Sequence, residues 1–262
     1  INPLFCDDTL ATIDVMRKLG ARIKRVSGDV DCLNICGFGG SPKIKSRVLN
    51  VGESGTLLRI AMPLVALAKG RHIVSGKGTL CQRPNKPIVE ALRLWGVGIS
   101  GRGQEHKLPV EINSSGSLTG GEIAVSGRMS SQTISSLLIA ASLAEKETVV
   151  DIKDHLVSRP YVDITIDVLK WMGVRVENKA YKRFRVHPGV LSKAHKDYIV
   201  RGDYSSAAFL MAAACLVPSH VVITDLVKDR QGDKAIISIL RRMGAVIEHK
   251  NDTVIIKGPF DL

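Results

Sequence analysis

The chain repeats itself with a period of about 75 residues, and this period constrains the fold more than any other feature. Four segments have the pattern of amphipathic helices that end at a glycine and pass into a strand: Asp8–Gly20, Lys86–Gly96, Pro160–Gly173 and Gly232–Gly244. Their closing glycines lie 76, 77 and 71 residues apart. Glycine readily adopts the left-handed conformation found after a helix C-terminus, so these endings predict four equivalent helices.

A second helix repeats between the first ones. It opens at Ser54, Ser130 and Ser205, which are 76 and 75 residues apart, and each opening leads into an Ala/Leu-rich stretch. A β-branched strand follows each time, at His72–Val74, Thr148–Ile152 and Val221–Ile223. One unit is therefore helix, three strands, serine-capped helix and strand, and the chain holds about three units and the start of a fourth. This predicts an α/β (or α+β) fold with buried helices wrapped by small sheets.

The composition favours a folded core and a small anionic ligand. Hydrophobic residues make up 45% of the 262 residues and charged residues 24%, which excludes a disordered chain. The formal net charge of +12 predicts attraction for nucleic acid, membrane phosphate or an acidic metabolite. Aromatic residues are only 4%, and Lys and Arg form no dense block, so we expect no nucleic-acid partner.

The remaining composition points to the cytoplasm. No apolar run reaches the roughly 18 residues that a membrane span needs, and the first residues lack the stages of a signal peptide. The chain also lacks an initiator Met, which suggests that it begins within a longer protein. Its five cysteines are scattered, without CxxC or zinc spacing. We therefore expect a cytoplasmic protein with no membrane partner, no metal site and no cofactor.

The serine-rich helix starts are candidate anion sites, because a helix N-terminus presents unpaired N–H groups and about half a positive charge. Ser130-Ser131-Gln132 places two hydroxyls and an amide in one turn, with Arg128 just upstream. Ser54-Gly55-Thr56 adds a glycine that lets a ligand approach the backbone, and Arg59 follows one turn later. Plain capping is the alternative for any single serine, and it is our interpretation of Ser205-Ser206.

Two arginines beside proline add candidate ligands. Arg83-Pro84 precedes the second repeat helix, and Ser158-Arg159-Pro160-Tyr161 precedes the third. Arginine can hold a carboxylate or phosphate with two parallel hydrogen bonds. Either alone would be typical of a solvated loop. Their position at helix starts, in a repeat that already gathers hydroxyls, favours anion binding.

Six motifs follow one another along the whole chain. They are Glu53-Ser54-Gly55-Thr56-Leu57-Leu58-Arg59, Gln82-Arg83-Pro84, Gly127-Arg128-Met129-Ser130-Ser131-Gln132, Leu156-Val157-Ser158-Arg159-Pro160-Tyr161-Val162-Asp163-Ile164-Thr165, Gly202-Asp203-Tyr204-Ser205-Ser206-Ala207 and Gln231-Gly232-Asp233. Together and in this order, they resemble the EPSP synthase family (3-phosphoshikimate 1-carboxyvinyltransferases).

The resemblance implies a reaction and an architecture. The family transfers the enolpyruvyl group of phosphoenolpyruvate to the 5-hydroxyl of shikimate 3-phosphate, releasing phosphate, in the shikimate pathway to chorismate and the aromatic amino acids. Its two lobes each contain three βαβαββ units, with the active site in the cleft between them. By this resemblance, residues 1–200 would form an incomplete shikimate-3-phosphate-binding lobe of three units, and residues 201–262 part of the second lobe.

The resemblance also implies site residues. The shikimate 3-phosphate ligands would be Ser130, Ser131, Gln132, Ser158 and Tyr161. The phosphoenolpyruvate ligands would be Gly55, Arg83 and Gln132, with Thr56 and Arg59 shaping the pocket. Glyphosate would compete at Gly55, and the full-length protein is expected to be a monomer.

The sequence departs from the family pattern in several places. Glu53-Ser54 stands where many members have Asn-Ala, which leaves glyphosate sensitivity open, and Arg159 stands where Lys is frequent. The family's early Lys-Ser/Thr…Arg motif, and the later Asp, Glu, Arg and Lys residues for proton transfer and phosphoenolpyruvate binding, have no counterpart here. We therefore expect the general acid and base to lie outside this chain. The isolated chain is predicted to bind shikimate 3-phosphate weakly and to turn over nothing detectable.

Two other functions stay open from the residues. Cys81 precedes Arg83-Pro84 by two residues, and a UDP-N-acetylglucosamine enolpyruvyl transferase has a cysteine ahead of an Arg-Pro, although further from it. A non-enzymatic phosphate- or RNA-binding module would use the +12 charge, and its affinity for single-stranded RNA would fall steeply with salt.

Overall fold

The computed structural model describes residues 1–26, 28, 31–189 and 197–259. The chain divides into two compact units. The larger unit is Pro3–Lys196, and the smaller unit is Ile1–Asn2 together with Asp197–Leu262. These units differ in their bounds from the lobes expected over residues 1–200 and 201–262, and the assignment of the units to lobes stays a prediction.

The larger unit contains most of the helices and strands. In chain order they are α1 (Asp7–Lys18), β1 (Arg22–Val26), β2 (Cys32–Cys36), β3 (Val48–Asn50), α2 (Gly55–Ala66), β4 (Gly70–Ser75), the 3₁₀ helix η1 (Gly78–Gln82), α3 (Lys86–Leu94), β5 (Gly98–Arg102), β6 (Lys107–Ser114), β7 (Gly121–Val125), α4 (Ser131–Ala141), β8 (Thr148–Ile152), α5 (Arg159–Trp171), β9 (Arg175–Lys179) and β10 (Arg183–His187).

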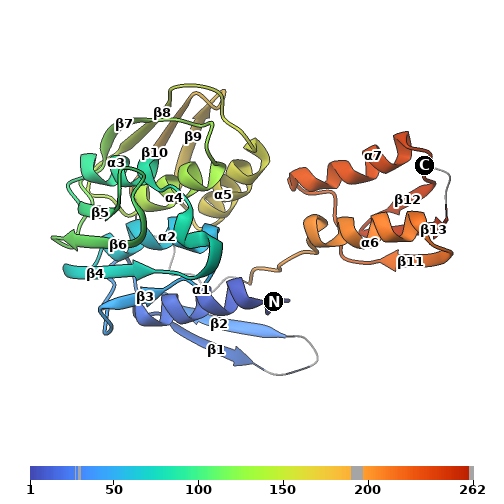
Figure 1. The fold of residues 1–262 in the computed structure, drawn as a ribbon, viewed down its shortest axis with the longest axis horizontal. Helices are drawn as coiled ribbons and strands as arrows, with labels where there is room; N and C mark the ends of the chain where they lie inside the picture. The colour runs from blue at the N-terminus through green and yellow to red at the C-terminus, as the bar shows by residue number, and fades with distance from the viewer. Residues whose placement is uncertain (27, 29–30, 190–196, 260–262) are drawn as a thin grey trace. The chain divides into compact units, whose positions relative to one another are not determined.

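The predicted repeat is visible in two sheets of the larger unit (Figure 1). One has the order β3-β4-β6-β5 and the other the equivalent order β7-β8-β10-β9. In each, the first two strands are parallel, joined through α2 or α4, and the remaining pairs are antiparallel. Each sheet with its helices is one βαβαββ unit, and α1 with the β1–β2 hairpin supplies the last three elements of another. The structure confirms the α/β class and the repeated unit.

The glycines that close the repeat helices have the backbone conformation that the sequence predicts. Their φ angles are positive: 109° at Gly20, 83° at Gly96, 91° at Gly173 and 111° at Gly244. A residue with a side chain is strained at such angles, so glycine ends each helix without steric strain. The chain then turns at once into the following strand.

The smaller unit contains α6 (Tyr204–Leu216), β11 (Ser219–Ile223), η2 (Gly232–Lys234), α7 (Ala235–Arg242), β12 (Ile247–Lys250) and β13 (Thr253–Gly258). Its sheet has the order β11-β13-β12, which repeats the antiparallel part of the larger sheets. The strand predicted just before α6 is not found among the described residues, and 190–196 lie outside them.

One predicted helix cap is wrong. Ser205 and Ser206 do not cap α6; Asp203 does, and its carboxylate accepts hydrogen bonds from the backbone N–H groups of both serines at 3.1 and 2.9 Å. A carboxylate is the stronger acceptor and carries the charge that a helix N-terminus favours. The serines therefore lie inside the first turn.

Helices α2 and α4 form the centre of the larger unit's core. Leu58, Ala61 and Met62 of α2, and Leu137 and Leu138 of α4, have no exposed surface. A helix that is apolar around most of its circumference is stable only when other elements surround it. Both helices are covered by the sheets of their own repeats and by each other (Figure 1). Among the described residues, no helix is both long and apolar enough to cross a membrane.

We predict that Leu138→Ala lowers the free energy of unfolding of the larger unit by about 2–5 kcal/mol, because it leaves a cavity in the core around a fully buried side chain. Leu94→Ala is the matched control, since that side chain is 67% exposed on α3 and its loss should cost about 0.5 kcal/mol or less. Trp95 and Trp171 are the two tryptophans of the chain, and both lie in the larger unit. Urea unfolding followed by tryptophan fluorescence therefore reports on that unit, and equal effects of the two substitutions would contradict the core position of α4.

Candidate anion-binding site

The start of α2 is tied to α1 by a serine. Ser54 is the N-cap, and its Oγ accepts a hydrogen bond from the backbone N–H of Leu57 at 3.3 Å. The same hydroxyl donates to Oδ2 of Asp8 at 3.0 Å. Ser54 is buried. The cap therefore satisfies one helix N–H and fixes where the next residue, Gly55, presents its backbone.

Two guanidinium groups and an amide gather around Gly55. A methyl carbon built on this glycine would lie 2.8 Å from Nη1 of Arg83, 3.3 Å from Nη1 of Arg59 and 3.8 Å from Oε1 of Gln132. Arg59 is only 7% exposed, and its Nη1 donates to the carbonyl of Gly55 at 2.9 Å. Burial, and then the charge of Arg83, hold the pKa of the Arg59 guanidinium below its ordinary value. Two like charges beside a helix N-terminus create a strongly positive site.

A side-chain hydrogen bond joins the starts of α2 and α4. Ser130 caps α4 by accepting from the backbone N–H of Gln132 at 3.1 Å. Nε2 of Gln132 donates to Oγ1 of Thr56 at 2.9 Å. Ser131, the first residue of α4, is buried. The hydroxyls and the amide predicted from two separate motifs therefore lie at one place.

The loop before α4 also contacts the loop before α5. The backbone N–H of Val157 donates to the carbonyl of Gly127 at 3.2 Å. A side chain at Gly127 would collide with this neighbour, because its Cβ would lie 2.9 Å from the Cα of Leu156. Glycine is therefore required for the two loops to meet, and Ser158 follows at the end of the second one.

Asp154 fixes the loop that leads to Ser130. Its carboxylate accepts from Oγ of Ser126 and from the backbone N–H of Gly127, both at 2.7 Å, and Nε of Arg128 lies 3.6 Å away. The hydrogen bond from Ser126 is the main cause that holds the pKa of Asp154 below its ordinary value. Arg128, predicted as an upstream cation, is therefore paired with this carboxylate.

The start of α5 carries the predicted ligands Ser158 and Tyr161, but Ser158 does not cap the helix with its side chain. Ser158 has left-handed backbone angles, φ 52° and ψ 43°, and its side chain makes no capping bond. Such angles are rare for a non-glycine residue, and rare angles persist mostly where the surroundings enforce them. Ser158 and Tyr161 are exposed. The guanidinium of Arg159 lies over the ring of Tyr181, 5.0 Å from its centroid, so this cation has an aromatic partner.

The structure thus brings most predicted site residues together in the larger unit. Gly55, Thr56, Arg59, Arg83 and Gln132 form one group, with Ser130 and Ser131 in the same turn as Gln132, and the loop carrying Ser158 abuts the Gly127 loop. Sequence reasoning missed the roles of Asp8 and Asp154. The carboxylate of Asp8 contacts a residue 46 positions away, and that of Asp154 contacts residues 27 and 28 positions away, so no local pattern predicts these contacts.

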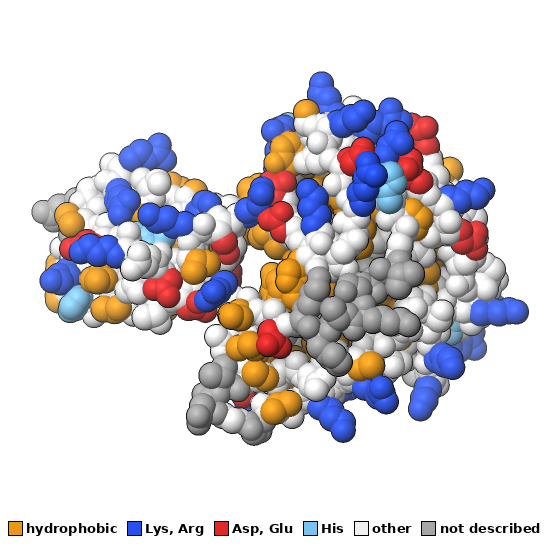
Figure 2. Space-filling model, turned by 180° about the vertical axis from the view of Figure 1, so that it is seen from behind, with side chains coloured by type: hydrophobic (Ala, Val, Ile, Leu, Met, Phe, Trp, Pro, Cys, Tyr) orange, Lys and Arg blue, Asp and Glu red, His pale blue; other side chains and the backbone are white. Residues whose placement is uncertain are grey.

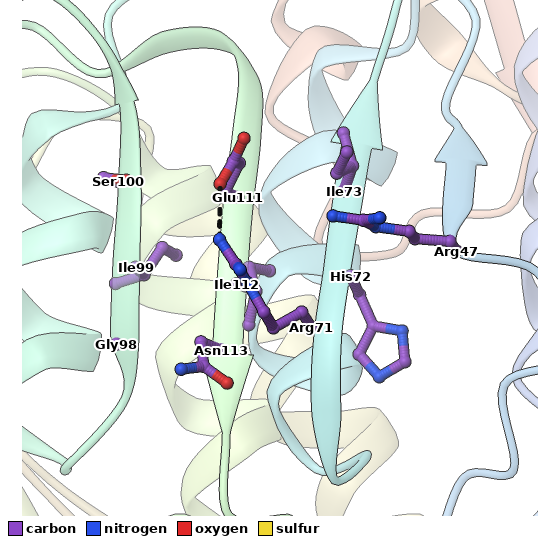
Figure 3. Close-up of a pocket in the computed structure, with 10 residues that line it drawn as sticks. All are labelled: Arg47, Arg71, His72, Ile73, Gly98, Ile99, Ser100, Glu111, Ile112 and Asn113. Carbon is purple, nitrogen blue, oxygen red and sulfur yellow. Dashed lines mark ion pairs between the residues drawn. The ribbon is translucent and has the colours of Figure 1, made fainter.

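A separate hollow lies elsewhere on the same unit. It has a volume of about 360 Å³ and lies on the sheet β3-β4-β6-β5, where Arg47, Arg71 and Asn113 line it (Figure 3). Arg71 is paired there with Glu111 at 3.7 Å. None of the predicted site residues lines this hollow. On the face of the molecule in Figure 2, Lys and Arg side chains are spread among acidic ones, without a continuous basic stripe.

The geometry defines a class: an α/β repeat protein in which the starts of equivalent helices from successive repeats meet at a group of arginine, amide and hydroxyl side chains. A family model described as EPSP synthase (3-phosphoshikimate 1-carboxyvinyltransferase) matches residues 1–261, and the chain belongs to this family.

The chain is also similar to individual members of this family. Proteins named 3-phosphoshikimate 1-carboxyvinyltransferase from Methanosarcina acetivorans and Methanocaldococcus jannaschii are 40% and 36% identical to the chain. These matches cover 94% and 100% of this chain, but 56% and 60% of the relatives. A solved structure of EPSP synthase from Acinetobacter baumannii has a TM-score of 0.77 at 27% identity, covering 98% of this chain and 57% of that one. The chain therefore spans less than two thirds of the length of these relatives. Their names and the family model do not favour the alternative of a UDP-N-acetylglucosamine enolpyruvyl transferase.

We predict that Gly55→Ala weakens binding of inorganic phosphate by roughly fivefold or more, because the new methyl group displaces the Arg83 guanidinium. The change should not unfold α2, since alanine is the better helix former. Gly37→Ala is the matched control, because no atom lies within 4 Å of its built Cβ. Phosphate titrations followed by NMR measure the affinities, and unchanged affinity in Gly55→Ala would exclude this glycine from the anion site.

We also predict a pH-dependent role for Asp154. Its depressed pKa means that its contribution to stability is present above the unfolded-state pKa and is lost as pH falls through the folded-state pKa. The stability difference between wild type and Asp154→Asn should therefore shrink as the pH falls below the ordinary pKa of an aspartate and the folded-state carboxylate gains its proton. Ser126→Ala removes the main cause of the shift and should give an intermediate profile. Urea unfolding at several pH values tests this, and a constant difference would contradict it.

Proposed function

We propose that this chain supplies the shikimate 3-phosphate side, and part of the phosphoenolpyruvate side, of an enolpyruvyl transferase. The reaction transfers the enolpyruvyl group of phosphoenolpyruvate to shikimate 3-phosphate, giving EPSP and phosphate. Family membership and the printed names of the relatives support this. The observation that carries it is the gathering of Arg59, Arg83 and Gln132 around Gly55.

The proposed phosphoenolpyruvate ligands are the residues around Gly55. Phosphoenolpyruvate carries a phosphate and a carboxylate, and both suit guanidinium groups that can donate two parallel hydrogen bonds. Arg83 is exposed and free to meet a ligand, whereas Arg59 is buried and adds fixed charge behind it. The missing side chain of Gly55 leaves room for the anion beside both. Thr56 holds Gln132 in place.

The proposed shikimate 3-phosphate ligands are the residues at the starts of α4 and α5. Ser130, Ser131 and Gln132 would bind the phosphate at the α4 N-terminus, where backbone N–H groups and hydroxyls favour an anion. Ser158 and Tyr161 would contact the ring. Gln132 belongs to both groups, so it would place the two substrates side by side. In this proposal Pro3–Lys196 is the shikimate-3-phosphate-binding lobe and the smaller unit is part of the second lobe.

The groups around Gly55 bind and orient, and they do not transfer protons at neutral pH. Guanidinium groups stay protonated, and amides and hydroxyls neither gain nor lose protons there. The proton donor to carbon and the base for the 5-hydroxyl would come from residues outside this group. We therefore propose that the isolated chain binds substrate without turnover. Glyphosate competition at Gly55, a cytoplasmic location and a monomeric full-length protein remain predictions.

Calorimetric titration of the 262-residue chain tests the proposal. We expect shikimate 3-phosphate to bind, and Ser158→Ala to weaken it by roughly fivefold with phosphoenolpyruvate affinity unchanged. Ser100→Ala, on β5 at the separate hollow, is the matched control and should change neither affinity.

The outcomes distinguish the alternatives. Binding of UDP-N-acetylglucosamine in place of shikimate 3-phosphate would contradict the proposal, as would tight, steeply salt-dependent binding of single-stranded RNA without binding of either substrate. Phosphate release by the isolated chain would overturn the expectation that the acid and base lie outside it.

A further inference from the structure

Asn85 makes contacts that its place in the sequence does not predict. It is the N-cap residue of α3, where an asparagine side chain usually accepts a hydrogen bond from the first turn. Here the side chain makes no capping bond. Its Nδ2 donates instead to the carbonyl of Arg83 at 3.2 Å and to the carbonyl of His106 at 2.9 Å.

The residue therefore clamps the Arg83 segment to the turn between β5 and β6. Its own backbone N–H donates to the carbonyl of Glu105 at 2.8 Å. A second tie lies beside it, where Nζ of Lys107 is 3.3 Å from Oε1 of Gln82. Within the turn, His106 has a positive φ of 50°, and its ring Nδ1 accepts a hydrogen bond from the N–H of Gly101 at 3.2 Å.

Burial indicates that the clamp is more than an incidental contact. Asn85 is 1% exposed, and its Oδ1 has no hydrogen-bond partner among the described residues. A buried amide oxygen without a partner is unfavourable, so an apolar residue would cost less if the position served packing alone. What the asparagine adds are its two donated bonds, and one of them fixes the peptide group of Arg83.

We propose that Asn85 is a positioning residue that sets anion affinity through Arg83. Arg83 is an exposed side chain on a loop, and it meets Gly55 only if its backbone is held in one orientation. Arg59 holds the next peptide from the other side, since its Nη2 lies 3.4 Å from the carbonyl of Pro84. The loop is thereby fixed between the β5–β6 turn and the buried arginine. Phosphoenolpyruvate as the anion rests on the proposed function; the positioning of Arg83 does not.

A double-mutant cycle on the 262-residue chain tests the inference, with inorganic phosphate and phosphoenolpyruvate as separate probes. We expect Asn85→Ala to weaken binding of either probe by roughly fivefold to tenfold, with less than about twofold change for shikimate 3-phosphate. In the Arg83→Ala background, Asn85→Ala should have no further effect, because it acts through Arg83. Asn113→Ala, at an exposed position of β6, is the matched control.

The cycle separates positioning from general destabilisation. If Asn85→Ala weakens phosphate binding equally with and without Arg83, or leaves it unchanged, the inference is overturned. If the alanine variant does not fold, Asn85→Ser replaces it in the cycle, because serine keeps a small polar side chain but lacks the Nδ2 donor, and the same loss of phosphate affinity is expected. The proposed function fails if the wild type binds neither phosphoenolpyruvate nor shikimate 3-phosphate but still binds inorganic phosphate through Arg83. In that case the double-mutant cycle measured with inorganic phosphate decides the role of Asn85. Absence of any Arg83-dependent phosphate binding would overturn both.

Discussion

Two guanidinium groups share the N-terminus of α2, and much of the surrounding structure follows from holding them there. A helix N-terminus already carries a partial positive charge, so acidic residues are the ones usually favoured in the first turn. Here Arg59, one turn further along, is buried and its guanidinium reaches back to the carbonyl of Gly55, with Arg83 beside it. This arrangement is unfavourable without an anion. It persists because α2 is anchored by apolar side chains along almost its whole length, and because Asp8 places a carboxylate behind the cap.

The repeat explains how one site arises from distant motifs. Helices α2 and α4 are equivalent elements of successive βαβαββ units, and they pack against each other in the core. Their N-termini therefore meet at the same end of the pair. The hydrogen bond from Gln132 to Thr56 joins residues 76 positions apart, which is one repeat period. Equivalent positions of two units thus contact each other directly, and the symmetry of the fold explains why the candidate ligands gather there.

The sequence was sufficient for those features that depend on local pattern. Four glycines with positive φ, two serine caps and the strands after the buried helices were all predictable, because each depends on residues close together in the chain. The gathering of Gly55, Thr56, Arg59, Arg83 and Gln132 was predictable too, since hydroxyls and arginines recur at equivalent positions of the repeat. What could not be predicted were the long-range partners. Asn85 has the sequence context of an ordinary cap, and only the folded β5–β6 turn brings the carbonyl of His106 within its reach.

The third helix start shows why the same position does not always make an anion site. At α6 the cap is Asp203, which meets two N–H groups with a negative charge of its own. Although burial acts to raise it, the hydrogen bonds from Ser206 and Ser205 hold the pKa of Asp203 below its ordinary value, so this cap is ionised at neutral pH. An ionised cap satisfies the positive potential of the helix and repels a second anion. The serine caps of α2 and α4 are neutral; the carboxylate of Asp8 contacts the Ser54 hydroxyl and not the N–H groups of α2, and Arg59 and Arg83 add positive charge at that start. The charge of the cap residue, more than the presence of serines, therefore separates the two helix starts that we propose as anion sites from the start of α6.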